Sequence, residues 1–148
     1  MKKEDIVRKL TSRKLWLSVA GFVTMLLVSM GETESTAKEI AALVPENAVV
    51  VGERSNQMLM SLPIRTATTF PANSDPMPVV RAVRKADPGA KLFALVDTQH
   101  AYNLQHYREH ADEVRLRLVK TLKMPSFSSG ALCDVHLCEI LPVRAKAK

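Results

Sequence analysis

The longest stretch of the chain without a charged side chain lies near its start, from Leu15 to Gly31 (LWLSVAGFVTMLLVSMG). Arg13 and Lys14 precede it, and Glu32 follows it. Seventeen helical residues rise about 25 Å, against a hydrocarbon core about 30 Å thick in a typical bilayer. Serine and threonine hydroxyls inside such a helix can bond back to the preceding turn. The pattern therefore predicts a transmembrane α-helix over residues 15–31.

Two other interpretations fit the same stretch. A basic region, an apolar run and small residues at Ser29 and Gly31 also describe a secretory signal peptide cleaved before Glu32. The third interpretation is a buried helix of a soluble domain.

The charge of the chain is concentrated beside this apolar stretch. The net charge is +6, and residues 1–14 contribute six basic and two acidic side chains, or +4, which leaves +2 for the remainder. Residues 1–14 read as a basic amphipathic lead-in at a membrane surface. Arg13, Lys14 and Trp16 are the expected interface anchors, and the positive-inside rule predicts a cytoplasmic N-terminus. Because no basic and aromatic binding pattern accompanies the charge, nucleic acid is not an expected partner.

A resemblance to a known family covers residues 9–44. The sequence Leu10-Thr11-Ser12-Arg13-Lys14-Leu15-Trp16, followed by the apolar stretch and the polar ETESTAKEIAALV, resembles the start of small holin-like membrane proteins of phages and prophages of Gram-positive bacteria. The resemblance implies a protein that self-associates in the bacterial cytoplasmic membrane and permeabilises it for lysis. It implies no enzyme activity and no cofactor. The lipid bilayer and further copies of the chain would be its partners.

The apolar stretch itself suggests how such copies would meet. Ser18 and Gly21 are small and three residues apart, which permits close helix approach. The bulkier Leu15, Phe22, Leu26 and Leu27 would face lipid or partner helices.

The second membrane helix of that family has no counterpart here. Pro45 and Glu46 interrupt the apolar residues that follow position 40. An alternative function is therefore a single-pass anchored or secreted α/β module that binds an unidentified ligand.

The remaining chain predicts a small α/β region. A helix is expected over residues 32–44 and is ended by Pro45. Residues 45–148 then predict strands at 48–51, 58–64, 91–96 and 131–143, with helices at 79–86 and 98–123. The change of character after residue 44 also fits a fusion or a frameshift, in which case the remainder would be unstructured. The predicted fold class is an N-terminal transmembrane helix followed by this α/β region.

Candidate chemistry is sparse. Asp97 and His100 stand at a predicted strand-to-helix junction, without a nucleophile motif or a glycine-rich phosphate loop. Metal ligands of the right type occur late in the chain, but their spacing matches no strong zinc signature, and on a strand Cys133 would point away from the two that follow it. These weak zinc candidates are His106, His110, Cys133, His136 and Cys138. The sequence therefore predicts no catalytic site and no cofactor.

Overall fold

The protein is a mixed α/β protein, seen in a computed structural model that describes residues 13–52, 59–69, 74–98, 102–125 and 131–144. Residues 1–12 of the predicted lead-in at 1–14 lie outside these residues, and its last two residues begin the first helix. The chain divides into two compact units, residues 1–32 and residues 33–148. Helix α2, at Arg13–Leu43, contributes its first part to the first unit and its last turns to the second.

In the first unit, α2 presents apolar side chains to solvent over most of its length. Among the residues described there, Leu17, Phe22, Leu27 and Met30 are each more than three-fifths exposed. The hydroxyl of Thr24 donates a hydrogen bond to the Ala20 carbonyl oxygen, at 2.9 Å. This is the back-bonding to the preceding turn that the sequence predicts for a hydroxyl inside an apolar helix.

The predicted transmembrane helix is wrong. Within the described parts of the chain, no helix is both long enough and apolar enough to cross a membrane. The helix does not stop at Gly31, where the uncharged stretch ends, but continues through Glu34, Lys38 and Glu39 to Leu43. The prediction treated the uncharged stretch as a separate element, whereas α2 ends in a charged segment that packs on a sheet. The fold class is accordingly corrected to mixed α/β, and the transmembrane and holin-like descriptions have no support.

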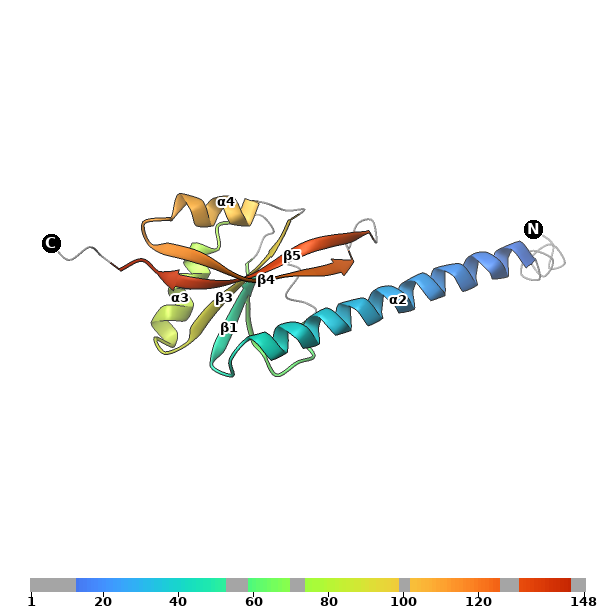
Figure 1. Ribbon diagram of the computed structural model, residues 1–148, viewed down its shortest axis with the longest axis horizontal. Helices are drawn as coiled ribbons and strands as arrows, with labels where there is room; N and C mark the ends of the chain where they lie inside the picture. Colours follow the sequence, from blue (N-terminus) through green and yellow to red (C-terminus); the bar gives the residue numbers. More distant parts are fainter. Residues whose placement is uncertain (1–12, 53–58, 70–73, 99–101, 126–130, 145–148) are drawn as a thin grey trace, which may run out of the picture. The chain divides into compact units, whose positions relative to one another are not determined.

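The second unit is built on a five-stranded sheet with the order β2-β1-β3-β5-β4 (Figure 1). Strands β1 and β3 are parallel neighbours, as are β1 and β2, whereas β5 runs antiparallel to both β3 and β4. The strands are β1 at Ala48–Gly52, β2 at Arg65–Thr68, β3 at Lys91–Asp97, β4 at Val114–Pro125 and β5 at Leu132–Pro142. Helix α3 at Met77–Ala86 connects β2 to β3, and helix α4 at Tyr102–Glu109 precedes β4.

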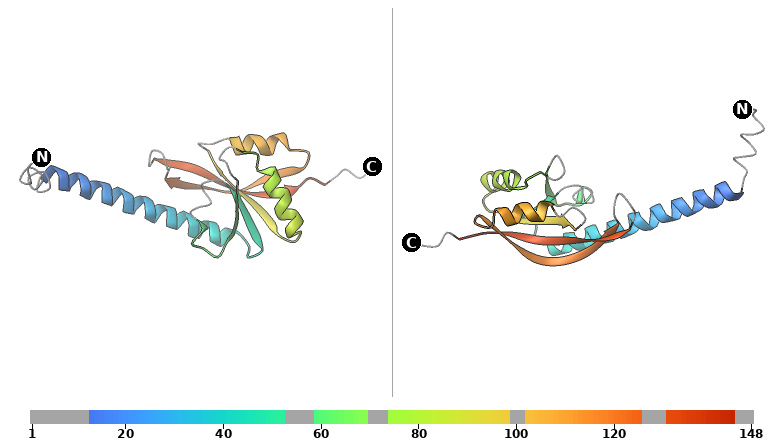
Figure 2. Two further views of the ribbon diagram at one scale, coloured as in Figure 1. Left: turned by 180° about the vertical axis from the view of Figure 1, so that it is seen from behind. Right: turned by 90° about the horizontal axis from the view of Figure 1, so that it is seen from above.

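Helices cover both faces of this sheet, so each face carries its own apolar core (Figure 2). On one face, Ala37 and Ile40 of α2 pack with Val50, Leu95 and other strand residues. On the opposite face, α3 supplies Met77 and Val80, and α4 supplies Tyr107. The strands β1 and β3 are apolar at nearly every position because both of their faces are buried.

The largest error in the predicted elements concerns residues 98–123. Apolar residues at steps of three or four, from Leu104 to Leu122, predict one long helix, but α4 ends at Glu109 and strand β4 begins at Val114. The sequence VRLRL alternates strictly, which is the strand period. A register shift between Leu118 and Lys120 then changes which positions face each core, and this bulge makes the apolar spacing resemble that of a helix.

The other predicted elements are largely confirmed. The strands at 48–51, 91–96 and 131–143 and the helix at 79–86 correspond to β1, β3, β5 and α3. The strand predicted at 58–64 is wrong, because the described residues there form turns and strand β2 begins only at Arg65.

Candidate functional site: a cleft between α4 and β4

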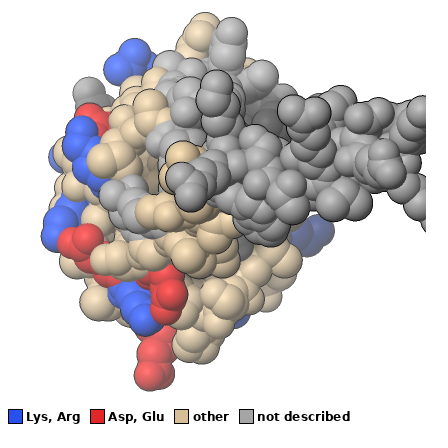
Figure 3. Space-filling model, turned by 90° about the vertical axis from the view of Figure 1, so that its right-hand side faces the viewer, with Lys and Arg blue, Asp and Glu red and all other residues tan. Residues whose placement is uncertain are grey.

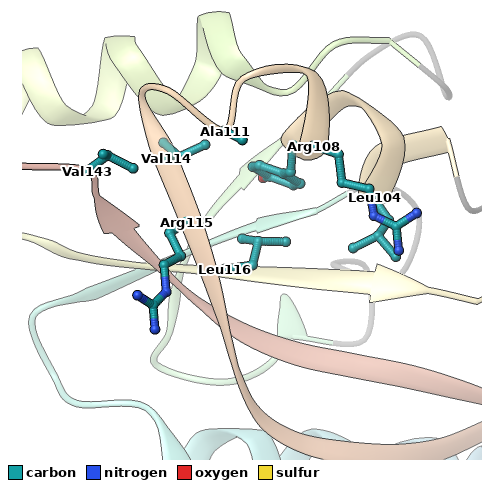
Figure 4. A pocket seen from close by; sticks show the side chains of 8 residues that line it. Leu104, Arg108, Ala111, Val114, Arg115, Leu116 and Val143 are labelled. Carbon is teal, nitrogen blue, oxygen red and sulfur yellow. The ribbon is translucent and has the colours of Figure 1, made fainter.

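A cleft of about 540 Å³ opens at one edge of the sheet, between α4 and the first half of β4 (Figure 4). Most of its lining is apolar. The lining residues are Leu104, Tyr107, Arg108, Ala111, Val114, Arg115, Leu116 and Val143. We call this hollow the α4–β4 cleft.

The cleft follows from the local sequence. Helix α4 has only eight residues, so it covers the start of β4 but not its middle. The alternation of β4 directs Val114 and Leu116 to the face beneath α4, and Leu116 is only partly buried there. A short helix over a longer apolar strand thus leaves part of the apolar face uncovered.

Of the two arginines among the lining residues, Arg108 stands at the rim of the cleft and Arg115 points away from it. Figure 4 shows Arg108 beside Leu104 at the α4 end, and it shows Arg115 directed to the opposite side of β4 from Leu116. Both side chains are exposed, and neither forms an ion pair with any described acidic residue. Arg81 and Arg117, by contrast, are paired with Glu113 and Glu139. The rim therefore carries one cationic group, the Arg108 guanidinium, that forms no ion pair with a described acidic residue and can bind an anion.

Tyr107 forms the floor and is almost completely buried, with 4% of its surface exposed. Burial raises the pKa of its hydroxyl well above the ordinary value, and the nearby Cys138 and Asp75 add to this increase. Asp75 also fixes the neighbouring elements: one carboxylate oxygen accepts a hydrogen bond from the Met77 amide at 2.9 Å, and the other lies 3.2 Å from His110 Nε2. The floor of the cleft is therefore an uncharged phenol, and Asp75 joins the elements beside it.

The surface around the second unit is mixed in charge. Figure 3 shows blue and red side chains next to one another on the face in view, without a large area of one sign. Exposed ion pairs such as Arg65–Asp87 and Arg81–Glu113 account for part of this mixture.

The predicted zinc ligands are not brought together. His106 pairs with Glu109, His110 with Asp75, and the His136 ring with the Thr121 hydroxyl. Cys133 and Cys138 are free thiols whose side chains belong to opposite cores of the sheet, and burial raises the pKa of both. Among the described residues, no group of three or more histidine, cysteine or acidic side chains is placed to hold a metal ion.

The other predicted residues lie elsewhere. Gly21, Phe22, Leu26 and Leu27 are exposed on α2 in the first unit. Leu15, Trp16, Ser18 and the anchors Arg13 and Lys14 lie on the same helix, but their side chains are outside the described part. Asp97 ends β3, and His100 lies outside the described residues.

Sequence reasoning missed the cleft completely. Its residues were assigned to one helix, which would have placed Arg108 and Arg115 two turns apart on a solvated face. The alternation of Val114, Leu116 and Leu118 with arginines was the signal that identifies the strand.

Fold and site together define a three-layer α/β protein with a mixed sheet and an apolar, arginine-rimmed cleft at one edge. Comparison with protein-family models finds no matching family, and comparisons with curated proteins and with solved structures find no match.

Proposed function

We propose that this protein is a binding module and that its ligand in the α4–β4 cleft is an apolar group that carries a carboxylate. One observation carries the proposal: a largely apolar cleft with Arg108 at its rim, where this arginine forms no ion pair with any acidic residue that the structure describes. Its volume of about 540 Å³ falls within the range of about 300–1,000 Å³ that is typical of small-ligand sites.

The chemistry of the lining favours binding over catalysis. Among the described residues, the lining holds two arginines and the buried Tyr107, whose pKa is raised. The side chains that most often act as general bases are histidine, aspartate, glutamate and lysine, and none of these is among the lining residues that the structure describes. Arginine instead binds carboxylates through paired, charge-assisted hydrogen bonds.

The test is titration of the full chain, labelled with ¹⁵N, with octanoate and separately with octylammonium. We expect octanoate to shift the amide signals of Ala111, Val114 and Leu116, and the amine of equal length to leave them unchanged. Arg108 contributes a charge-assisted bond of about 1.5–3 kcal/mol. The variant Arg108→Gln should therefore bind octanoate at least about tenfold more weakly.

Lys85→Gln is the matched control, because it removes an exposed cation from α3 without touching the cleft. Its affinity for octanoate should equal that of the unmodified protein. Equal binding of acid and amine would show that the site selects apolarity alone. Amide signals of the cleft that do not move at saturating octanoate would contradict the proposal.

A further inference from the structure

The cleft opens onto the free edge of the sheet, because β4 is the last strand of the sheet order. The direction of its backbone groups follows from one hydrogen bond: the Val143 amide donates to the Glu113 carbonyl oxygen, at 3.0 Å. In an antiparallel pair, hydrogen-bonded and non-hydrogen-bonded positions alternate. Val114, Leu116 and Leu118 therefore direct their amide and carbonyl groups away from β5, and the amide of Val114 already donates to the His110 carbonyl oxygen, at 3.0 Å. Val114 is paired with Pro142 at a non-hydrogen-bonded position. Proline fits there because it has no amide hydrogen and none is needed for a bond to β4.

The second half of β4 is already covered. The Thr36 hydroxyl of α2 donates to the Lys123 carbonyl oxygen at 2.7 Å, and Lys120 pairs with Glu39 of the same helix. The bulge between Leu118 and Lys120 separates this covered half from the first half. Covering an edge with a helix is one way in which proteins prevent unwanted strand pairing. Within the described part of the chain, Leu116–Leu118 has no such cover, and Leu118 is 57% exposed.

The two faces of this open segment differ in chemistry. Leu116 and Leu118 lie on the face of the cleft, whereas Arg115 and Arg117 lie on the other face. Directly opposed side chains on adjacent strands interact, and like charges in such positions are destabilising. A second copy of β4 would oppose arginine to arginine, so self-pairing is disfavoured. An added strand fits best if its residues alternate between apolar and acidic.

We propose that an extended peptide of alternating apolar and acidic residues, supplied by a partner protein, adds to Leu116–Leu118 as a sixth strand and places an apolar side chain in the α4–β4 cleft. This inference rests on the proposed function, because it identifies the carrier of the apolar group that enters the cleft. Main-chain hydrogen bonds supply affinity in this mode of recognition, and side-chain pockets supply specificity.

The probe is an end-blocked, fluorescently labelled Leu-Glu repeat peptide, added to the full chain and followed by anisotropy. We expect saturable binding that a block isomer of the same composition and a Leu-Lys repeat do not reproduce. N-methylation of every second backbone nitrogen should weaken binding at least tenfold in one register and leave it unchanged in the other. The two registers differ because only every second amide of the peptide faces β4 and can donate a hydrogen bond to it.

Leu118→Glu in the protein should also weaken peptide binding at least tenfold, because it places a like charge on the open edge. Leu132→Glu changes an exposed leucine of β5 in the same way and should have no effect. Neither substitution touches the core, so both variants should bind octanoate as the unmodified protein does. If both N-methyl registers bind equally, or if the peptide fails to bind while octanoate still does, strand addition is overturned and the cleft proposal stands. Failure of octanoate itself removes the basis of both.

Discussion

Asp75 joins two helices through its two carboxylate oxygens. One oxygen accepts the Met77 amide at the start of α3, and the other lies 3.2 Å from His110, just after α4. Capping bonds of this kind contribute about 0.5–2 kcal/mol to the free energy of unfolding. The Asp75 side chain thus holds the N-terminus of α3 and the residue that follows α4. Because α4 forms one wall of the cleft, Asp75 also helps to position that wall.

We expect Asp75→Ala to lower the free energy of unfolding by about 1–2 kcal/mol. Asp75→Asn retains an oxygen for the Met77 amide but removes the negative charge beside His110, so it should cost less. Urea unfolding followed by circular dichroism measures both variants. Equal losses for the two substitutions would assign the effect to the charge and not to the cap.

The burial of Tyr107 makes the free energy of unfolding depend on pH. Its pKa is raised by burial, so the folded state favours the protonated phenol. The stabilisation from the buried phenol of Tyr107 is fully present below the pKa of tyrosine in the unfolded chain, which is about 10. It is lost as the pH rises above that value. Stability should therefore decline at alkaline pH.

The chain has two tyrosines, so Tyr102→Phe isolates the signal of Tyr107. In this variant, we expect the ultraviolet absorbance of tyrosinate to appear only together with unfolding, above about pH 10. An ordinary titration near that pH in the folded protein would show that the hydroxyl is solvated. Tyr107→Phe should remove the alkaline loss of stability that this group causes.

At the scale of elements, the bulge in β4 decides how one strand serves two cores. Val114 packs under α4, whereas Leu122 and Met124 pack on the opposite face with α2. Strict alternation would place all three even-numbered positions on one face. The extra residue Val119 changes the face, which is why a strand of twelve residues contributes to both layers.

Deletion of Val119 tests the bulge. Without the extra residue, Leu118 opposite Cys138 and Lys120 opposite Leu137 become consecutive pairs of a regular ladder, so Leu122 and Met124 keep the face that they occupy now. We expect the deletion variant to retain cooperative thermal unfolding. Val119→Thr, which keeps the extra residue at an exposed position, should unfold within about 1 kcal/mol of the unmodified protein. A deletion variant that loses cooperative unfolding would contradict this role for the bulge.

At the scale of the whole molecule, the two units differ in what they bury. Every buried apolar residue in the described chain belongs to the second unit, whereas the large apolar side chains described in the first unit are exposed. Large contiguous apolar surfaces on proteins mark interaction sites or promote association. We therefore expect the exposed part of α2 to govern association and the second unit to govern stability.

Sedimentation velocity tests this division. The full chain should form oligomers, and Phe22→Glu/Leu26→Glu should shift it toward the monomer, while Ala42→Glu, at an exposed site of the same helix, should not. A chain of residues 33–148 should be monomeric and should unfold at a similar urea concentration. Monomeric sedimentation of the full chain would contradict the role of the exposed segment.

Particular residues show how far the sequence was sufficient. Ala48–Gly52 and Lys91–Asp97 are short apolar runs between turn residues, so local pattern identified both as strands of the sheet. Val114–Pro125 was misassigned because its bulge alters the spacing. The cleft could not be predicted without β4, since Arg108 and Leu116 line one cleft only when a helix and a strand meet there.

The sequence by itself determined the elements whose pattern is local: the buried strands, the helix α3 and the uncharged stretch of α2. Tertiary structure alone decided which part of α2 is exposed and which part packs on the sheet. It also decided which strands are neighbours, and that half of the β4 edge is covered while half is open. The physical reason is that a periodic pattern records which side of an element is buried but not what buries it. The cover comes from residues distant in sequence, such as Thr36 on Lys123 and Tyr107 on Val114.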